Sequence, residues 1–215
     1  MSQDQSPHEN PFDQQFWDER YGGSEDVWSG APNPLLVERA SGLTPGTALE
    51  VGSGEGADAI WLASRGWQVT ALDLSPVGLA RAASRAAALG ADVADNITWQ
   101  QADLLEWKPS TQRFDLVTAQ FMHLPRAALE VLHRQLAAVV APGGSLLVVG
   151  HHPADHDGSA HRPDRDLFFT AEQVAAVLDD CWEILLAGAP ERQALNREGQ
   201  LATVRDAVLH AVRRR

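Results

Sequence analysis

Three glycines at alternate positions, directly after a short apolar segment, constrain this chain more than any other feature. We expect a strand over residues 48–51, which runs into Gly52, Gly54 and Gly56 before a helix expected over residues 57–65. A strand that turns directly into a helix leaves unpaired backbone N–H groups and the positive end of the helix dipole at the turn. Glycines let a ligand approach that backbone, because no Cβ stands in the way. The stretch therefore predicts a nucleotide-cofactor site.

Composition limits the classes of protein to consider. With 215 residues the chain can form one core, and 17 basic against 29 acidic residues give a net charge of −12. This charge argues against a nucleic-acid partner, because phosphate binding needs clustered cations. The single Cys181 excludes an intramolecular disulfide and fits a reducing compartment. The polar N-terminus lacks the pattern of a signal peptide, and no apolar run could span a membrane, so we expect a cytoplasmic protein without a membrane partner. We also expect a monomer or a homodimer.

Strands and helices alternate after the glycine turn. Further strands are expected at residues 68–72, 97–101, 115–119 and 145–150, and further helices at residues 76–88 and 126–140. This alternation is typical of βαβ units and a parallel sheet. The C-terminal part departs from it, because a helix at residues 170–178 precedes two strands at residues 182–187 and 203–212 that are joined only by a polar stretch. Such strands usually pair antiparallel.

The predicted fold is therefore α/β and Rossmann-like, with a seven-stranded, mostly parallel sheet, a C-terminal antiparallel hairpin and helices on both faces. We expect residues 1–10 to be a flexible tail and residues 47–215 to be the cofactor-binding core of a single domain. Residues 11–46 are expected to form an N-terminal helical lid or substrate segment, with short helices at residues 11–21 and 35–40, and the aromatic residues of 11–34 are suited to closing over a bound cofactor.

Two cofactor classes compete for the glycine turn. Gly52, Gly54 and Ala57 satisfy the loose dinucleotide fingerprint, and Asp73 lies at the distance expected for its ribose-binding acid, so an NAD-dependent oxidoreductase is one alternative. Other features favour a different cofactor. Glu50 stands two residues before the first glycine, and three segments end or open later strands: ALDLSP at 71–76, QADL at 101–104 and APGGSLL at 141–147.

In this order and spacing, these segments resemble the class I S-adenosylmethionine-dependent methyltransferases, from about residue 16 to the end of the chain. The runs PGTALE at 45–50, WLASRGWQVT at 61–70 and FWDERY at 16–21 are most similar to the small thiopurine and tellurite-resistance branch. The resemblance implies S-adenosylmethionine as cofactor and a small-molecule methyl acceptor such as a thiol, a metalloid or a phenol. A methyltransferase-like binding module without catalysis is a further alternative.

The chemistry of S-adenosylmethionine assigns expected roles to residues at the strand ends. Asp73 can accept hydrogen bonds from both ribose hydroxyls, and Asp103 can accept one from the adenine amino group. Glu50 can bind the amino group of the methionine end of the cofactor. The alternative is that Glu50 caps the neighbouring helix and that Asp103 caps a loop. The remaining expected cofactor contacts are the turn residues Gly52, Ser53 and Gly54, the adenine neighbours Leu74 and Leu104, Gln120 at the methionine end, and the lid aromatics Trp17, Tyr21 and Trp28.

Histidines are the candidate catalytic residues. His151 and His152 follow the fifth expected strand and His123 follows the fourth, at the edge where the cofactor must present its methyl group. A neutral imidazole there can take the proton from an acceptor, although a soft thiol or metalloid would need no base. The histidines and aspartates of residues 151–161 could instead bind a divalent metal, but they show no recognised ligand spacing, and we predict no metal site.

Overall fold

The computed structural model describes residues 13–23, 26–122, 124–155, 167–195 and 201–215. Its helices are α1 (Gln14–Tyr21), α2 (Pro34–Ala40), α3 (Ala57–Ser64), α4 (Pro76–Ala88), α5 (Ala91–Ala94), α6 (Arg126–Ala138) and α7 (Ala171–Ala175), with the short 3-10 helix η1 (Pro153–Asp155). Its strands are β1 (Thr47–Val51), β2 (Gln68–Asp73), β3 (Ile97–Gln101), β4 (Phe114–Gln120), β5 (Val140–His151), β6 (Trp182–Gly188), β7 (Glu191–Leu195) and β8 (Leu201–Arg213).

One sheet organises the molecule, in the order β3-β2-β1-β4-β5-β8-β6, and β7 pairs with β8 outside this path. The strands from β3 to β5 pair parallel, whereas β8 lies antiparallel to both β5 and β6. The predicted mostly parallel sheet with antiparallel C-terminal strands is confirmed. The expected count of seven strands is corrected to eight, because the stretch we expected to be a polar connection contains β7, which pairs antiparallel with the first residues of the 13-residue β8.

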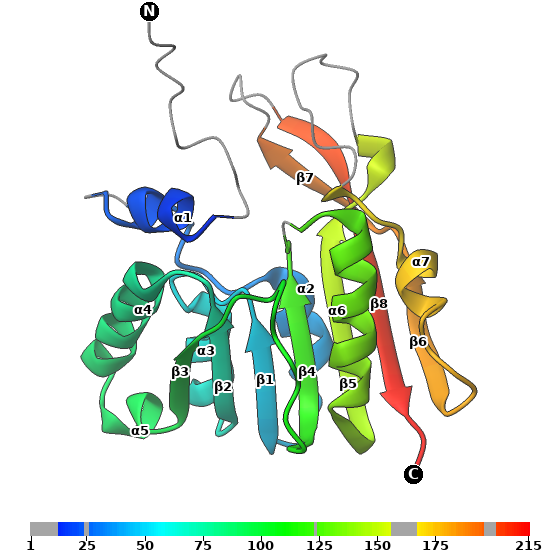
Figure 1. Ribbon diagram of the computed structural model, residues 1–215, viewed down its shortest axis with the longest axis horizontal. Coiled ribbons are helices and arrows are strands. Elements are labelled where there is room, and N and C mark those ends of the chain that lie inside the picture. The colour runs from blue at the N-terminus through cyan, green and yellow to red at the C-terminus, as the bar shows by residue number, and fades with distance from the viewer. Residues whose placement is uncertain (1–12, 24–25, 123, 156–166, 196–200) are drawn as a thin grey trace, which may run out of the picture.

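Helices cover both faces of the sheet (Figure 1). Neighbouring strand residues point to opposite faces, so Leu116 and Val117 of β4 belong to different core clusters. Val117 and Leu146 pack with Leu129, Leu132 and Leu136 of α6, whereas Leu116 and Leu147 pack with Leu36 of α2 and with Ala59 and Leu62 of α3. The sheet is therefore apolar on both sides, as a sheet between two helical layers must be.

Local signals set the ends of several helices. α4 begins with Pro76 after the cap residue Ser75, whose Oγ accepts the N–H of Gly78 at 3.1 Å, as the sequence predicts. α6 ends at Ala138, two residues earlier than expected, because Val140 already pairs with Phe114 and begins β5. The predicted helix at residues 170–178 is shorter, and its α-helical part is α7.

The order of the strands creates a crevice. β1 lies between β2 and β4, so the chain leaves β1 toward one side for β2 and β3 and returns on the other side for β4. Ligands of open α/β sheets bind at such a switch point, outside the carboxyl ends of the strands. Figure 1 shows α1 and β7 beyond this same edge of the sheet, α1 on the side of β2 and β3 and β7 on the side of β5 and β8. None of the helices in the described ranges has the length and apolar character of a membrane span.

Candidate active site

A cavity of about 1250 Å³ lies at this edge of the sheet. It brings together every residue that the sequence predicts as a cofactor contact: Trp17, Tyr21, Trp28, Glu50, Gly52, Ser53, Gly54, Asp73, Leu74, Asp103, Leu104 and Gln120. Of the candidate catalytic histidines, His151 lines the cavity, His152 is not among its lining residues, and His123 lies outside the described residues.

The glycine turn is shaped by backbone conformation and by close contacts. Gly52, Gly54 and Gly56 have φ angles of 73°, 51° and 81°, which residues with a Cβ rarely adopt. A Cβ on Gly52 would also collide with the Met122 sulfur, and one on Gly54 would lie 2.8 Å from the Tyr21 hydroxyl. The turn therefore requires glycine both for its geometry and for the approach of the groups above it.

Two buried polar atoms beside this turn have no partner among the described residues, namely Glu50 Oε2 and Ser53 Oγ. Burial raises the pKa of Glu50 well above its usual range, and the charges of Asp58 and Asp73 raise it further. The backbone N–H of Ala59 donates to Glu50, so the expected helix-capping alternative is also present in part. Because an unsatisfied buried polar group costs about 1–3 kcal/mol, this arrangement fits a polar ligand that supplies the missing partners.

Asp58, which the sequence analysis did not single out, ties the N-terminal segment to the site. Its Oδ1 accepts the backbone N–H of Asn33 at 2.6 Å, and burial raises its pKa to about 6. Asn33 in turn donates to Gln120 Oε1 at 3.1 Å, and Gln120 donates to Thr118 at 2.6 Å. An acid in the first turn of a helix after a glycine turn was the available signal, but it is also an ordinary helix-start residue.

Aromatic side chains cover the glycine turn from above. The rings of Trp17 and Tyr21 stack at 5.7 Å, and Trp28 Nε1 donates to the Tyr21 hydroxyl at 3.3 Å. Tyr21 is only 4% exposed. Its ring packs close to Gly78, and a Cβ on Gly78 would lie 3.0 Å from the Tyr21 ring carbon Cδ2. Burial, together with the charge of Asp73, raises the pKa of the Tyr21 hydroxyl.

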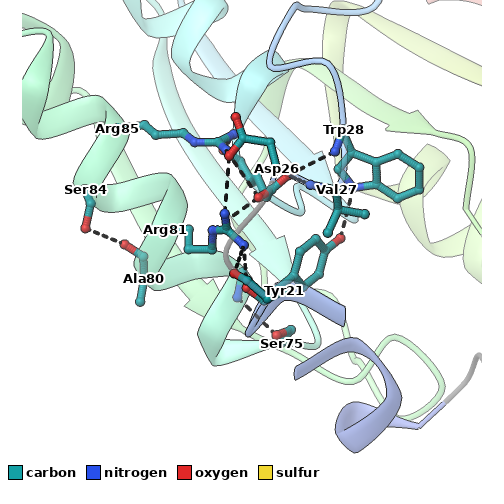
Figure 2. A network of polar contacts seen from close by, with 12 residues as sticks. Tyr21, Asp26, Val27, Trp28, Ser75, Ala80, Arg81, Ser84 and Arg85 are labelled. Atoms are coloured by element: carbon teal, nitrogen blue, oxygen red, sulfur yellow. Dashed lines mark hydrogen bonds and ion pairs between the residues drawn. The ribbon is translucent and has the colours of Figure 1, made fainter. Parts of the chain in front are cut away.

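The buried Glu55 holds this cover in place, and the sequence analysis missed its role. Its Oε2 accepts the backbone N–H groups of Val27 and Trp28 at 3.1 and 3.2 Å, and its Oε1 pairs with Arg81 and Arg85, each at 3.2 Å. Figure 2 shows the two arginines reaching from α4 toward Asp26, with Arg81 also at the backbone of Tyr21. The N-terminal segment is thereby fastened to α4 and to the glycine turn.

The side of the cavity expected to bind adenine is less polar. Leu104 is 9% exposed, and both it and Leu74 line the cavity. Asp103 Oδ1 accepts the backbone N–H of Leu105 at 2.9 Å, so the loop-capping alternative for Asp103 is realised while the residue still lines the cavity.

The opposite side of the cavity carries a second aromatic group, which the sequence analysis did not find. The ring of His151 lies 4.7 Å from that of Phe121 and 5.9 Å from that of Phe168. Arg192, from β7, lies over Phe121 at 6.0 Å and pairs with the buried Asp206 of β8. Phe121, His151 and Arg192 lie at or next to the ends of β4, β5 and β7, whereas Asp206 lies within β8 and Phe168 lies before α7.

His152 and the other residues of the histidine-rich stretch take different places. His152 Nδ1 accepts the backbone N–H of Ala154 at 3.1 Å, which ties the imidazole to its own turn. His156, Asp157 and His161 lie outside the described residues. Within the described ranges, no group of three or more histidine, cysteine or acidic side chains could hold a metal ion.

Comparisons with known proteins agree on one family. A family model described as a methyltransferase domain matches residues 48–144. The 2-heptyl-1-hydroxyquinolin-4(1H)-one methyltransferase of Mycobacteroides abscessus is 30% identical over 139 residues, which cover 61% of this chain and 60% of that protein. The ribosomal RNA small subunit methyltransferase J of Rhodopseudomonas palustris is 35% identical over 118 residues, covering 50% and 53%. The ubiquinone biosynthesis O-methyltransferase of Serratia proteamaculans is 36% identical over 120 residues, covering 53% and 48%.

The chain thus spans only about half to three fifths of these relatives' length. Among solved structures, TehB from Haemophilus influenzae superposes with a TM-score of 0.69 at 17% identity, covering 94% of this chain and 67% of that one. At this level of identity the likeness shows a common fold.

Proposed function

We propose that this chain, whose sequence and fold are those of a class I S-adenosylmethionine-dependent methyltransferase, transfers the methyl group of S-adenosylmethionine to a small-molecule acceptor. The observation that carries the proposal is the pair of buried, unpartnered atoms Glu50 Oε2 and Ser53 Oγ, which lie beside the glycine turn in the cavity that Asp73 also lines. A ligand with an amino group and hydroxyl groups would satisfy these atoms.

Different residues of the cavity would bind different parts of the cofactor. Asp73 would accept the ribose hydroxyls, Glu50 the amino end, and Leu74 and Leu104 would pack on the adenine. Glu50 is suited to a cationic amino group. A positive charge beside the buried carboxylate stabilises its ionised form, so the raised pKa of Glu50 would fall when such a group binds. The cofactor supplies a methyl group activated by a sulfonium charge. The protein therefore has mainly to orient the acceptor and exclude water, which can lower the barrier by about 7–11 kcal/mol.

Two observations support a small-molecule acceptor. The net charge of −12 disfavours a polyanionic substrate, and the aromatic side chains of Tyr21 and Trp28 lie over the glycine turn inside the cavity. The relatives include proteins named for both kinds of acceptor, a hydroxyquinolinone and ribosomal RNA. Transfer of radiolabelled methyl to thiols, phenols, quinols and metalloid oxyanions, with ribosomal RNA as a further arm, tests this part of the proposal.

Ligand-induced stabilisation tests the cofactor and separates the alternatives. S-adenosylhomocysteine at about 100 times its dissociation constant should raise the melting temperature by about 5–10 °C. NAD at the same concentration should not. A shift with NAD alone would favour the oxidoreductase, and a shift with S-adenosylhomocysteine without methyl transfer to any acceptor would favour a binding module.

A further inference from the structure

Arg192 is held in a fixed orientation on the side of the cavity away from the glycine turn. Its Nε and Nη2 donate to the two carboxylate oxygens of Asp206 at 2.6 and 3.2 Å, and the Asp206 side chain is only 3% exposed. Two such contacts fix the plane of a guanidinium, which carries five N–H donors in a rigid fork. Because Nη1 takes part in neither contact and Arg192 is 42% exposed, the guanidinium can still donate to a ligand in the cavity.

Phe121 beside it adopts a costly backbone conformation. It is the one non-glycine residue with a positive φ angle, 51°, among the described residues. Bulky residues in this conformation are uncommon and concentrate at functional sites. The Phe121 ring lies 6.0 Å from the guanidinium of Arg192 and 4.7 Å from the imidazole of His151. The ring of Phe168 lies 5.9 Å from that of His151, and we call these three cavity-lining residues, Phe121, His151 and Phe168, the aromatic wall.

We propose that the aromatic wall and Arg192 form the acceptor subsite, and that they select a planar aromatic acceptor bearing an anionic oxygen, a carboxylate or a phenolate. The proposal rests on the methyltransferase function proposed above and specifies its substrate class. The wall provides apolar surface for flat rings. Arg192 provides a charge-assisted hydrogen bond at the end of that surface.

Asp206 lines the cavity as the partner of Arg192, and the acids around the glycine turn and the other arginines lie or are engaged elsewhere. The acids Glu50, Asp58 and Asp73 surround the glycine turn, on the side assigned to the cofactor. Of the other arginines that line the cavity, Arg85 pairs with Asp26 and Glu55, and Arg20 lies over the rings of Trp17 and Trp28. An anionic substituent of the acceptor therefore meets Arg192 as the cation beside the aromatic wall.

A purely structural role for Arg192, as a fastener between β7 and β8, gives a different expectation. The same hairpin carries a second ion pair, between Arg205 and Glu191 at 2.6 Å, whose side chains are 43% and 55% exposed. Neither residue of this pair lines the cavity. Arg205→Met therefore serves as a matched control, because it removes an arginine and its ion pair with Glu191 from the same hairpin at a side chain that does not line the cavity.

The test compares 6-hydroxy-2-naphthoate with its amide, which has the same ring system and nearly the same shape but no anionic group, by calorimetry on full-length protein saturated with S-adenosylhomocysteine. The wild type should bind the acid roughly tenfold more tightly than the amide. Arg192→Met should abolish this preference, Arg192→Lys should restore part of it, and Arg205→Met should keep it.

Three results would overturn the inference. The first is that the wild type binds the two probes equally or binds neither. The second is a loss of preference in Arg205→Met as large as in Arg192→Met, and the third is that Arg192→Met weakens binding of S-adenosylhomocysteine as much as binding of the acid. The last result would assign Arg192 to the cofactor. Failure of the proposed function would look different, because the wild type would then bind no S-adenosylhomocysteine or would methylate none of the acceptor classes.

Discussion

Asp73 Oδ2 accepts the backbone N–H of Gly54 at 2.7 Å, so the acid at the end of β2 and the glycine turn after β1 form one unit. The other oxygen, Oδ1, accepts the N–H of Ser75 at 2.9 Å and thereby reaches the cap of α4. The backbone N–H of Leu74 is a further partner of this carboxylate. Because a carboxylate has about four lone-pair sites, Asp73 can still accept a hydrogen bond from a ligand. Asp73 can therefore shape the site and bind the ribose at the same time.

Asp73→Ala is expected to raise the dissociation constant of S-adenosylhomocysteine by roughly 10- to 150-fold, because hydrogen bonds to a charged group contribute about 1.5–3 kcal/mol. The melting temperature should also fall, since the N–H groups of Gly54 and Ser75 lose their acceptor. Calorimetry on the folded variant measures the first effect, and Asp95→Ala, at an exposed site, is the control. An unchanged dissociation constant would remove Asp73 from the cofactor site.

The fold was predictable where its signals are local. The parallel strands β1, β4 and β5 contain apolar runs next to glycines or polar turns, and Ser75 and Pro76 mark the start of α4. β7 was not predictable, because its described side chains Glu191, Arg192 and Gln193 are exposed and show no apolar alternation. Such a strand is stabilised by its pairing with β8, and a non-local partner leaves no trace in the strand's own sequence.

Some residues of the candidate site could likewise be predicted from local sequence signals, and others could not. Glu50 and Asp73 lie near the ends of β1 and β2, and Asp103 follows β3, all within recognisable segments, so their position at one cavity could be inferred from the sequence. Glu55 and Arg192 could not be placed, because their partners lie elsewhere in the chain. Glu55 contacts a backbone 28 residues earlier, and Arg192 contacts Asp206 across a hairpin that was itself not predicted.

Glu55→Gln is expected to loosen the cover over the cavity. The variant keeps a polar side chain but loses the charge that accepts the N–H groups of Val27 and Trp28 and pairs with two arginines. Hydrogen exchange of amides in residues 13–22 and 26–34 should become faster, and the dissociation constant of S-adenosylhomocysteine should rise roughly 5- to 10-fold.

Glu130→Gln is the control for this experiment, because Glu130 pairs with Arg134 on the surface of α6, with both side chains more than half exposed. Faster exchange in Glu55→Gln alone supports the fastening role. Saturation with S-adenosylhomocysteine should then slow exchange of the same amides in the wild type. If it does not, the N-terminal segment is a fixed cover rather than a lid.

Asp58→Asn should change the pH dependence of stability in a defined direction. Burial raises the pKa of Asp58 from 3.8 to about 6, so the folded state binds a proton more readily than the unfolded state. The contribution of Asp58 to stability is therefore present in full below about pH 4 and is lost as the pH rises through 6. Between pH 7 and pH 5 the wild type should gain about 1 kcal/mol relative to Asp58→Asn.

Urea denaturation of both proteins at several pH values measures this difference. The variant can still accept the Asn33 N–H through its amide oxygen, so the comparison isolates the charge. Burial also lowers the pKa of His133 to about 4, which acts in the opposite direction as the pH falls but cancels in the difference between the two proteins. A difference that is constant from pH 7 to pH 5 would contradict the raised pKa of Asp58.

The two neighbouring histidines give the last prediction, because the structure separates them. His151 lines the cavity beside Phe121, whereas His152 accepts a hydrogen bond from Ala154 in its own turn. If an imidazole takes the proton from the acceptor, His151→Ala should lower kcat by roughly 10²- to 10⁴-fold with little change in the affinity for S-adenosylhomocysteine. His152→Ala should keep nearly full turnover. Measurement of turnover at several pH values adds a second criterion. An acceptor that binds as its anion needs no base, so turnover by His151→Ala should recover as the pH rises above the pKa of the acceptor. Equal losses in the two variants would mean that neither histidine acts as the base and that their effect is structural.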